Sequence, residues 1–236
     1  MAARPRRGSR AGRPVGVGDG ARDEASPGGW GDALDRLAEA VFASREGRRR
    51  AEPLLAAQDA IIGGLGLGDH PHAVLQAHRV DWALCDMQVP AGEPGETWAY
   101  RASLGRVPEV TPTPEVAILA GSIVGLFEVW RARGALILRE RLCGVVAHLA
   151  EGEAPLEIEG EVGLWETRIV LRPEGARLCR PPIAYPVEIL PWLERAALQR
   201  WTGTMSVDLL DLRAMWLRWR RAPGAEPGHF FTGHGG

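Results

Sequence analysis

The sequence predicts an α+β fold with a helical N-terminal part, a small antiparallel β sheet or barrel in the centre, and two C-terminal helices. Two observations carry this prediction. Apolar residues recur at three- and four-residue spacing before residue 112 and again after residue 190, which is the period of helices. Between residues 125 and 171, short β-branched and aromatic runs are separated by glycines, which is typical of short strands.

Composition limits the class of protein. The chain has 236 residues, is 45% hydrophobic and 25% charged, and carries a net charge of -2, as ordinary globular proteins do. All 28 basic residues are arginine, which indicates a GC-rich bacterial genome more than a chemical requirement. Cys85, Cys143 and Cys179 form no CxxC pair, so we expect a reducing, cytoplasmic location. No apolar run reaches the length of a membrane span, so we expect a soluble protein with no membrane partner.

Residues 1–29 are rich in Gly, Pro and Arg, with few large apolar side chains. Such a segment cannot bury enough surface to offset its ordering entropy, so we expect a disordered arm. A translation start assigned too far upstream is an alternative origin. A basic arm that contacts nucleic acid or an acidic partner is the functional alternative.

Residues 30–112 are predicted to form a helical region. The apolar spacing predicts a helix over Trp30–Arg45 that ends at Gly47, and a second helix that carries Pro53 in its first turn and ends at Gly63 and Gly64. Arg48, Arg49 and Arg50 are expected in the solvated connection. Further helices are expected over Pro71–Met87 and over Glu96–Leu104, the second within a loop rich in proline and glycine.

Two stretches of this region have residue types that occur in ligand sites. The GGLGLG run from Gly63 to Gly68 follows a helix and lacks the G-x-G-x-x-G register, so we do not expect a phosphate loop. His78, Asp81 and Cys85 are the weak metal candidates. His78 and Cys85 lie two helical turns apart, about 10 Å along the axis, which is too far for one ion. We therefore expect neither a metal site nor a cofactor.

Residues 113–222 are predicted to form a small β module with flanking helices. Thr113-Pro114-Glu115 has the residue types that begin a helix. Strands are expected over Leu126–Arg131, Ala135–Arg139, Val145–Leu149, Val162–Leu171 and Ala176–Cys179. In the fourth strand, Trp165, Thr167, Ile169 and Leu171 form the expected core face, because alternate side chains share one side of a strand.

Charge is divided within the module. The first hairpin carries Arg131, Arg133, Arg139 and Arg141, and the segment before the fourth strand carries Glu151, Glu153, Glu157, Glu159 and Glu161. If the two segments face each other, they form ion pairs that contribute little individually. The functional alternative is a polar binding face on a small barrel.

The module contains a short sequence motif. Gly125-Leu126-Phe127-Glu128-Val129 is followed by an LxLRxxLxG pattern made by Leu136, Leu138, Arg139, Leu142 and Gly144. This motif resembles that of a group of uncharacterised bacterial hypothetical proteins. The resemblance covers residues 80–170 and implies one structural module, with no known activity.

Two helices are predicted after Arg180-Pro181-Pro182. The first begins at Pro191 and ends at Gly203, and Ser206 is a candidate cap for the second. Leu209, Leu212, Trp216 and Trp219 repeat at helical spacing and form an apolar seam that packs in the core or contacts a partner. Residues 223–236 are expected to be a disordered tail.

No catalytic or nucleotide-binding signature occurs in the chain. We therefore expect a non-enzymatic interaction or scaffold protein that binds an unknown protein partner or associates with itself. Two alternatives remain open: a nucleic-acid-binding protein that uses its arginine clusters, and an enzyme of unrecognised class. The candidate partner-binding residues are Arg131, Arg133, Arg139, Arg141, Trp216 and Trp219.

Overall fold

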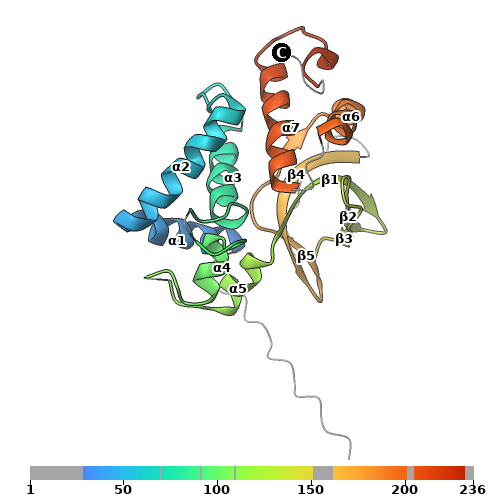
Figure 1. The fold of residues 1–236 in the computed structure, drawn as a ribbon. Helices are drawn as coiled ribbons and strands as arrows, with labels where there is room; N and C mark the ends of the chain where they lie inside the picture. The colour runs from blue at the N-terminus through green and yellow to red at the C-terminus, as the bar shows by residue number, and fades with distance from the viewer. Residues whose placement is uncertain are drawn as a thin grey trace, which may run out of the picture.

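The computed structural model describes residues 29–69, 71–90, 92–108, 110–150, 162–200 and 205–231. Figure 1 shows helices at the N-terminal side, a curled sheet in the centre and two helices after it, which confirms the predicted α+β architecture. The expected arm, residues 1–29, lies outside the described residues except for Gly29. In the described part of the chain, no helix is long and apolar enough to cross a membrane.

The first two helices, α1 (Trp30–Ala43) and α2 (Arg45–Ile62), meet at a sharp corner. Ser44 caps α2, because its Oγ accepts a hydrogen bond of 2.8 Å from the backbone N–H of Gly47. The prediction that Gly47 ends the first helix is wrong. Gly47 lies in the first turn of α2, and a Cβ there would lie 1.9 Å from the carbonyl oxygen of Val41, so only glycine lets the two helices meet so closely.

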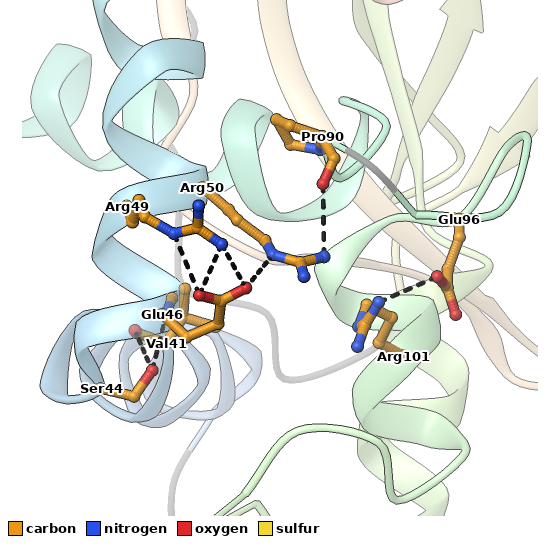
Figure 2. Close-up of polar contacts among 9 residues, drawn as sticks. Val41, Ser44, Glu46, Arg49, Arg50, Pro90, Glu96 and Arg101 are labelled. Carbon is orange, nitrogen blue, oxygen red and sulfur yellow. Dashed lines mark hydrogen bonds and ion pairs between the residues drawn. The ribbon is translucent and has the colours of Figure 1, made fainter.

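The arginine run lies in α2 and not in the connection before it. Arg48 donates to the carbonyl oxygen of Phe42 at 2.6 Å, which satisfies one of the last carbonyls of α1. Figure 2 shows Arg49 and Arg50 converging on Glu46, and Arg50 reaching the carbonyl oxygen of Pro90 at 3.3 Å. The expected location in the connection is therefore wrong for this run. The expected solvation holds for Arg48 and Arg49, which are exposed, whereas Arg50 is partly buried and ties α2 to the chain beyond α3.

Three more helices precede the sheet: α3 (His72–Cys85), α4 (Trp98–Ser103) and α5 (Pro114–Ala120). Thr113 caps α5, with its Oγ1 3.4 Å from the backbone nitrogen of Val116, as its sequence predicts. Before α4, the buried carboxylate of Glu96 accepts hydrogen bonds from Arg101 at 3.1 Å and Arg106 at 3.0 Å. The Glu96–Arg101 contact, also visible in Figure 2, fixes this loop against its helix.

Six antiparallel strands make one curled sheet, a half-barrel with the order β3-β2-β1-β4-β5, and β6 also pairs with β4. A bridge between Leu149 and Ala176 brings the two edges of this sheet together. Five strands lie where the sequence predicts them, whereas β6 was not predicted. The strands are β1 (Ile123–Ala132), β2 (Ala135–Glu140), β3 (Val146–His148), β4 (Val162–Arg172), β5 (Gly175–Leu178) and β6 (Ile183–Tyr185).

The concave interior of the half-barrel is apolar and is built around Phe127, Val129, Leu138, Trp165 and Ile169. Trp165 and Ile169 are thus on a core face, as predicted for the fourth strand. Leu171, at the end of β4, is half exposed, so that part of the prediction is wrong. The opposite face of β4 is buried as well, because helices cover it.

One glycine and one acid sit together at an end of the interior. Glu140 is buried, and its carboxylate accepts hydrogen bonds from the backbone nitrogens of Leu126, at 3.1 Å, and Leu142, at 2.7 Å. Gly125 lies beside it. A Cβ on Gly125 would lie 2.7 Å from Cγ of Glu140 and 2.9 Å from the ring of Phe127. The space that the acid occupies therefore depends on the missing side chain at residue 125.

The C-terminal helices are α6 (Leu190–Arg200) and α7 (Met205–Arg220). In Figure 1, α7 runs between the pair α2 and α3 and the sheet, and it contacts both α2 and β1. Residues 208–217 of α7 are all buried except Asp211, so this part of the helix is buried on more than one side and does not carry a single apolar seam, whereas Arg218 and Arg220 at its end are exposed. The predicted cap residue, Ser206, lies inside the helix.

The expected disordered tail is partly folded. Residues 223–231 turn back after α7 through a short 3-10 helix, Pro227–His229. Phe231 is 1% exposed and belongs to the largest core cluster, which also contains residues of α2, α3, β1, β4 and α6. The prediction of disorder is therefore wrong for this segment, and the cluster that contains Phe231 joins helices on both sides to the sheet.

Candidate functional site

The three metal candidates of α3 each have another partner or environment. Nε2 of His78 lies 2.9 Å from the carbonyl oxygen of Pro181, so this nitrogen carries the ring proton. The carboxylate of Asp81 is held by Arg180, at 3.0 and 3.1 Å. Burial raises the pKa of the Cys85 thiol to about 12, which disfavours the thiolate that a metal needs. Among the described residues, no group of three or more His, Cys, Asp or Glu side chains could hold a metal ion.

A buried ionic network surrounds these residues, and we call it the α3–β4–α7 network. It joins the covered outer face of β4 to helices α3 and α7. Three of its arginines are each paired with a carboxylate: Arg213 with Glu166, Arg168 with Asp86, and Arg180 with Asp81.

The pair of Glu166 and Arg213 lies at the centre of the network. The side chains of Glu166 and Arg213 are 1% and 4% exposed. Nε of Arg213 donates to Oε1 of Glu166 at 3.1 Å, and the hydroxyl of Tyr185 donates to Oε2 at 2.5 Å. Burial works to raise the pKa of Glu166, but the charge and hydrogen bond of Arg213 outweigh it, so the pKa is lowered and the carboxylate stays ionised.

Two neighbouring groups are held in their neutral forms. Burial lowers the pKa of His78, and the positive charge of Arg213 lowers it further. Burial raises the pKa of Tyr185 well above its usual value, and the nearby Glu166 carboxylate adds to the rise. Perturbed groups of this kind mark catalytic sites when they line a cleft, but here they lie under helices, and each has a partner in the fold: His78 bonds to the carbonyl oxygen of Pro181, and Tyr185 donates to Glu166. Their arrangement fits a role in holding α3 and α7 on the sheet.

Of the two tryptophans predicted to contact a partner, Trp216 is 1% exposed and packs in the core, with its ring centroid 4.8 Å from that of Tyr185. Trp219 is partly buried, and its Nε1 donates to the carbonyl oxygen of Ala225 at 2.9 Å. The fold thus places Trp216 where no partner can reach it, and Trp219 holds the returning tail.

The predicted arginines separate into two groups. Arg141 donates to Glu128 at 2.9 Å and to Glu194 at 2.8 Å, which ties the end of β2 to α6. In contrast, Arg131, Arg133 and Arg139 are exposed, and within the described ranges no hydrogen bond or ion pair is found for them. Their expected acidic counterparts, Glu151 to Glu161, lie outside the described residues.

The exposed arginines adjoin a sheet surface that no helix of the described chain covers. Trp130 pairs with Ile137, and Arg139 with Val146, so these four side chains share the outer face of β1, β2 and β3. Val146 is 62% exposed, and Trp130 and Ile137 are partly exposed. None of these three apolar residues belongs to a core cluster. Figure 1 shows β2 and β3 on the side of the sheet away from α1 to α5.

We call this surface the open face, defined by the outer-face residues Trp130, Ile137, Arg139 and Val146 together with the exposed end of the β1–β2 hairpin, Arg131 and Arg133. Arg131 pairs with Leu136 of the interior, so its side chain leaves the strand on the side opposite Trp130. The sequence analysis identified its arginines but missed Trp130. Trp130 follows Val129 in a strand, and because neighbouring side chains point to opposite faces, it could have been assigned to the face opposite Val129. It also missed Glu166, Arg168 and Arg213. Each of these charged residues lies in the middle of an otherwise apolar strand or helix. A charge at such a position indicates a buried ion pair.

The glycine run that failed as a phosphate loop borders an open hollow on the surface, lined in part by Arg220 and Arg221. Arg221 donates to both carboxylate oxygens of Asp69, at 3.0 and 2.6 Å, and to the carbonyl oxygen of Gly64 at 2.6 Å. These bonds hold the loop against the end of α7, which explains the arrangement without a ligand.

Comparisons with known proteins found no match: none among protein-family models, none among curated proteins and none among solved structures. The resemblance of residues 80–170 to uncharacterised bacterial proteins therefore stays a hypothesis. The two arrangements of the described chain that bear on function are the α3–β4–α7 network and the open face.

Proposed function

We propose that this protein is a non-enzymatic interaction protein whose open face binds an acidic segment of a protein partner. One observation carries the proposal. Trp130 and Arg139 are exposed in part or in full on the half of the sheet that no helix of the described chain covers, and exposed Arg131 and Arg133 lie at the end of the same hairpin; none of the three arginines has an acidic partner in the described chain.

The chemistry of the open face fits protein recognition. Tryptophan and arginine are enriched among the residues that dominate binding energies, and apolar centres with polar rims are typical of interfaces. Trp130, Ile137 and Val146 supply the apolar area, and the arginines supply charge-assisted donors for carboxylates. An acidic segment that also carries an apolar side chain would satisfy both parts.

The experiment compares binding partners of matched variants. The first variant replaces Arg131, Arg133 and Arg139 with Gln, and the second is Trp130→Ser. The control replaces three exposed arginines that lie on helices outside the open face with Gln: Arg36, Arg45 and Arg195. Quantitative affinity purification of each variant should show partners that the wild type and the control retain and that both open-face variants lose.

Binding is then measured with purified material, by titrating the wild type with a synthetic acidic segment of the recovered partner. We expect both open-face variants to bind at least about tenfold more weakly, since loss of a dominant contact costs more than about 1 kcal/mol. Equal affinity of the wild type and both variants would refute the proposed face.

Binding of nucleic acid is the second candidate, because the same unpaired arginines could contact phosphates. The two candidates differ in their salt dependence. If three arginines contact duplex DNA, log K should fall against log salt with a slope of about -3. The absence of DNA and RNA binding at low salt would remove this candidate and leave the protein partner.

A further inference from the structure

Two buried arginines of the α3–β4–α7 network have nitrogens without a hydrogen-bond partner in the described chain. They are Nε of Arg168 and Nη1 of Arg213. The two side chains are 3% and 4% exposed, so bulk solvent does not reach them freely. A buried donor left without an acceptor costs roughly 1–3 kcal/mol, and such groups are rare in native proteins. We therefore expect each of the two nitrogens to donate a hydrogen bond to an acceptor outside the described chain.

Both arginines line the same small cavity between α3, β4 and α7. The cavity offers about 10 Å³ to the centre of a water-sized molecule, which is room for one water and little more. Asp81, Asp86 and Glu166 line it too, so their carboxylates can accept hydrogen bonds from a molecule bound in the cavity. Size and polarity agree: the site suits a molecule that accepts from two guanidinium groups and donates to carboxylates.

We propose that this cavity binds one ordered water molecule, which accepts hydrogen bonds from Arg168 and Arg213 and donates to the surrounding carboxylates. The water joins three elements that are far apart in the sequence, because Arg168 lies on β4, Arg213 on α7, and the carboxylates of Asp81 and Asp86 at the end of α3. Buried waters of this kind commonly make about three hydrogen bonds and form part of the fold.

Charge balance favours water over a small anion such as chloride, which would also accept from two guanidinium groups. Three carboxylates line the cavity, and each is paired with one arginine, namely Glu166 with Arg213, Asp86 with Arg168, and Asp81 with Arg180. An additional negative charge at this buried position would have no counter-charge. A neutral molecule adds hydrogen bonds without upsetting the balance.

The direct test is a high-resolution crystal structure of the wild type with data also collected from a crystal soaked in bromide. We expect one solvent peak within hydrogen-bond distance of Nε of Arg168 and Nη1 of Arg213, without an anomalous bromide signal. A bromide peak at this position would show an anion site and overturn the proposal. A cavity without a peak would overturn it equally.

A solution test uses Val124→Ile, because Val124 lines the cavity and the added methyl group is similar in size to a water. The control is Val129→Ile, inside the half-barrel. Magnetic relaxation dispersion of water should show one fewer long-lived internal water in Val124→Ile than in the wild type and in the control. The Tm of Val124→Ile should fall by roughly 2–10 °C, since the two donors lose their acceptor. An unchanged count of long-lived waters in a folded Val124→Ile variant would contradict the proposal.

Discussion

The outer face of the sheet differs sharply between its two halves. On β4, the charged side chains of Glu166 and Arg168 lie under α3 and α7, and each has a partner of opposite charge. On the half that β1 and β2 form, Arg139 of the outer face and the hairpin-end residues Arg131 and Arg133 are exposed and have no partner within the described chain. The difference shows that cover by helices, and not the strand sequence, decides whether a charge on this sheet must be paired. Buried charges then contribute to holding the fold, and exposed ones remain available to another molecule.

The contrast is tested most strongly by removing one arginine from each half. Arg213→Ala leaves Glu166 buried without its counter-charge and should lower the free energy of unfolding by about 3–5 kcal/mol. Arg139→Ala removes an exposed charge and should change it by less than about 0.5 kcal/mol. Urea unfolding followed by circular dichroism measures both. Similar losses for the two variants would remove the distinction between the halves.

A double variant sharpens this measurement. In Arg213→Met/Glu166→Met, both charges are replaced by apolar side chains, so no buried charge remains without a partner. We expect the double variant to be more stable than Arg213→Ala, because replacing both members of a buried pair costs less than breaking it.

A second comparison is between a glycine packed tightly on the interior face of the same sheet, Gly125, and a glycine in an exposed loop, Gly68. Gly125→Ala would place a Cβ 2.7 Å from Cγ of Glu140 and should cost roughly 1–3 kcal/mol through overpacking. The control is Gly68→Ala, in an exposed loop where a Cβ would meet nothing within 4 Å. Denaturant midpoints of both variants test the difference, and a neutral Gly125→Ala would show that Glu140 can move aside.

The pH dependence of the free energy of unfolding tests the buried groups in the half of the sheet that α3 and α7 cover. Because burial lowers the pKa of His78 in the folded state, the unfolded chain binds this proton more readily. Stability is therefore complete above about pH 6.5 and falls as the pH drops below it, by up to about 1.4 kcal/mol per pH unit. The lowered pKa of Glu166 keeps its carboxylate charged through this range, so it does not add to the effect.

The measurement is the unfolding free energy between about pH 7.5 and about pH 5. His78→Gln should flatten the curve, because it removes the group that must otherwise stay neutral. His148→Gln, at an exposed position on β3, is the matched control and should keep the wild-type slope. If the two variants share one slope, the loss of stability in acid has another origin.

The smallest change in stability is expected on the open face. Trp130→Ser should alter the free energy of unfolding by less than about 1 kcal/mol, because Trp130 belongs to no core cluster. Trp216→Ala, in contrast, should cost about 3–5 kcal/mol. Thermal unfolding of the pair separates a tryptophan available for binding from one that fills the core. A large loss for Trp130→Ser would count against the open face.

The sequence predicted most of the fold because short-range patterns determine it. Helices with apolar periodicity and strands separated by glycine lie close to their expected positions. β6 was missed, since a three-residue strand shows no alternation and forms only through its pairing with β4. The folded tail was also missed, because burial of Phe231 depends on a core assembled by distant elements.

The candidate sites were harder to predict for the same reason. Arg131, Arg133 and Arg139 could be identified as a cluster on one hairpin, but their sequence does not show which helices leave that hairpin uncovered. Glu166 and Arg213 are 47 residues apart, and only the packing of α7 across β4 makes them a pair. Local patterns report which residues are charged, whereas tertiary packing decides which of them are paired.

The close contact between Gly125 and Glu140 also provides a way to recognise relatives of this protein. The absent side chain at residue 125 provides the room in which the Glu140 carboxylate binds the backbone of Leu126 and Leu142. In evolution the two positions should therefore change together: a chain with a larger residue at the first position should carry a short side chain at the second. Such covariation across one hairpin would mark homologues even where the rest of the sequence has diverged.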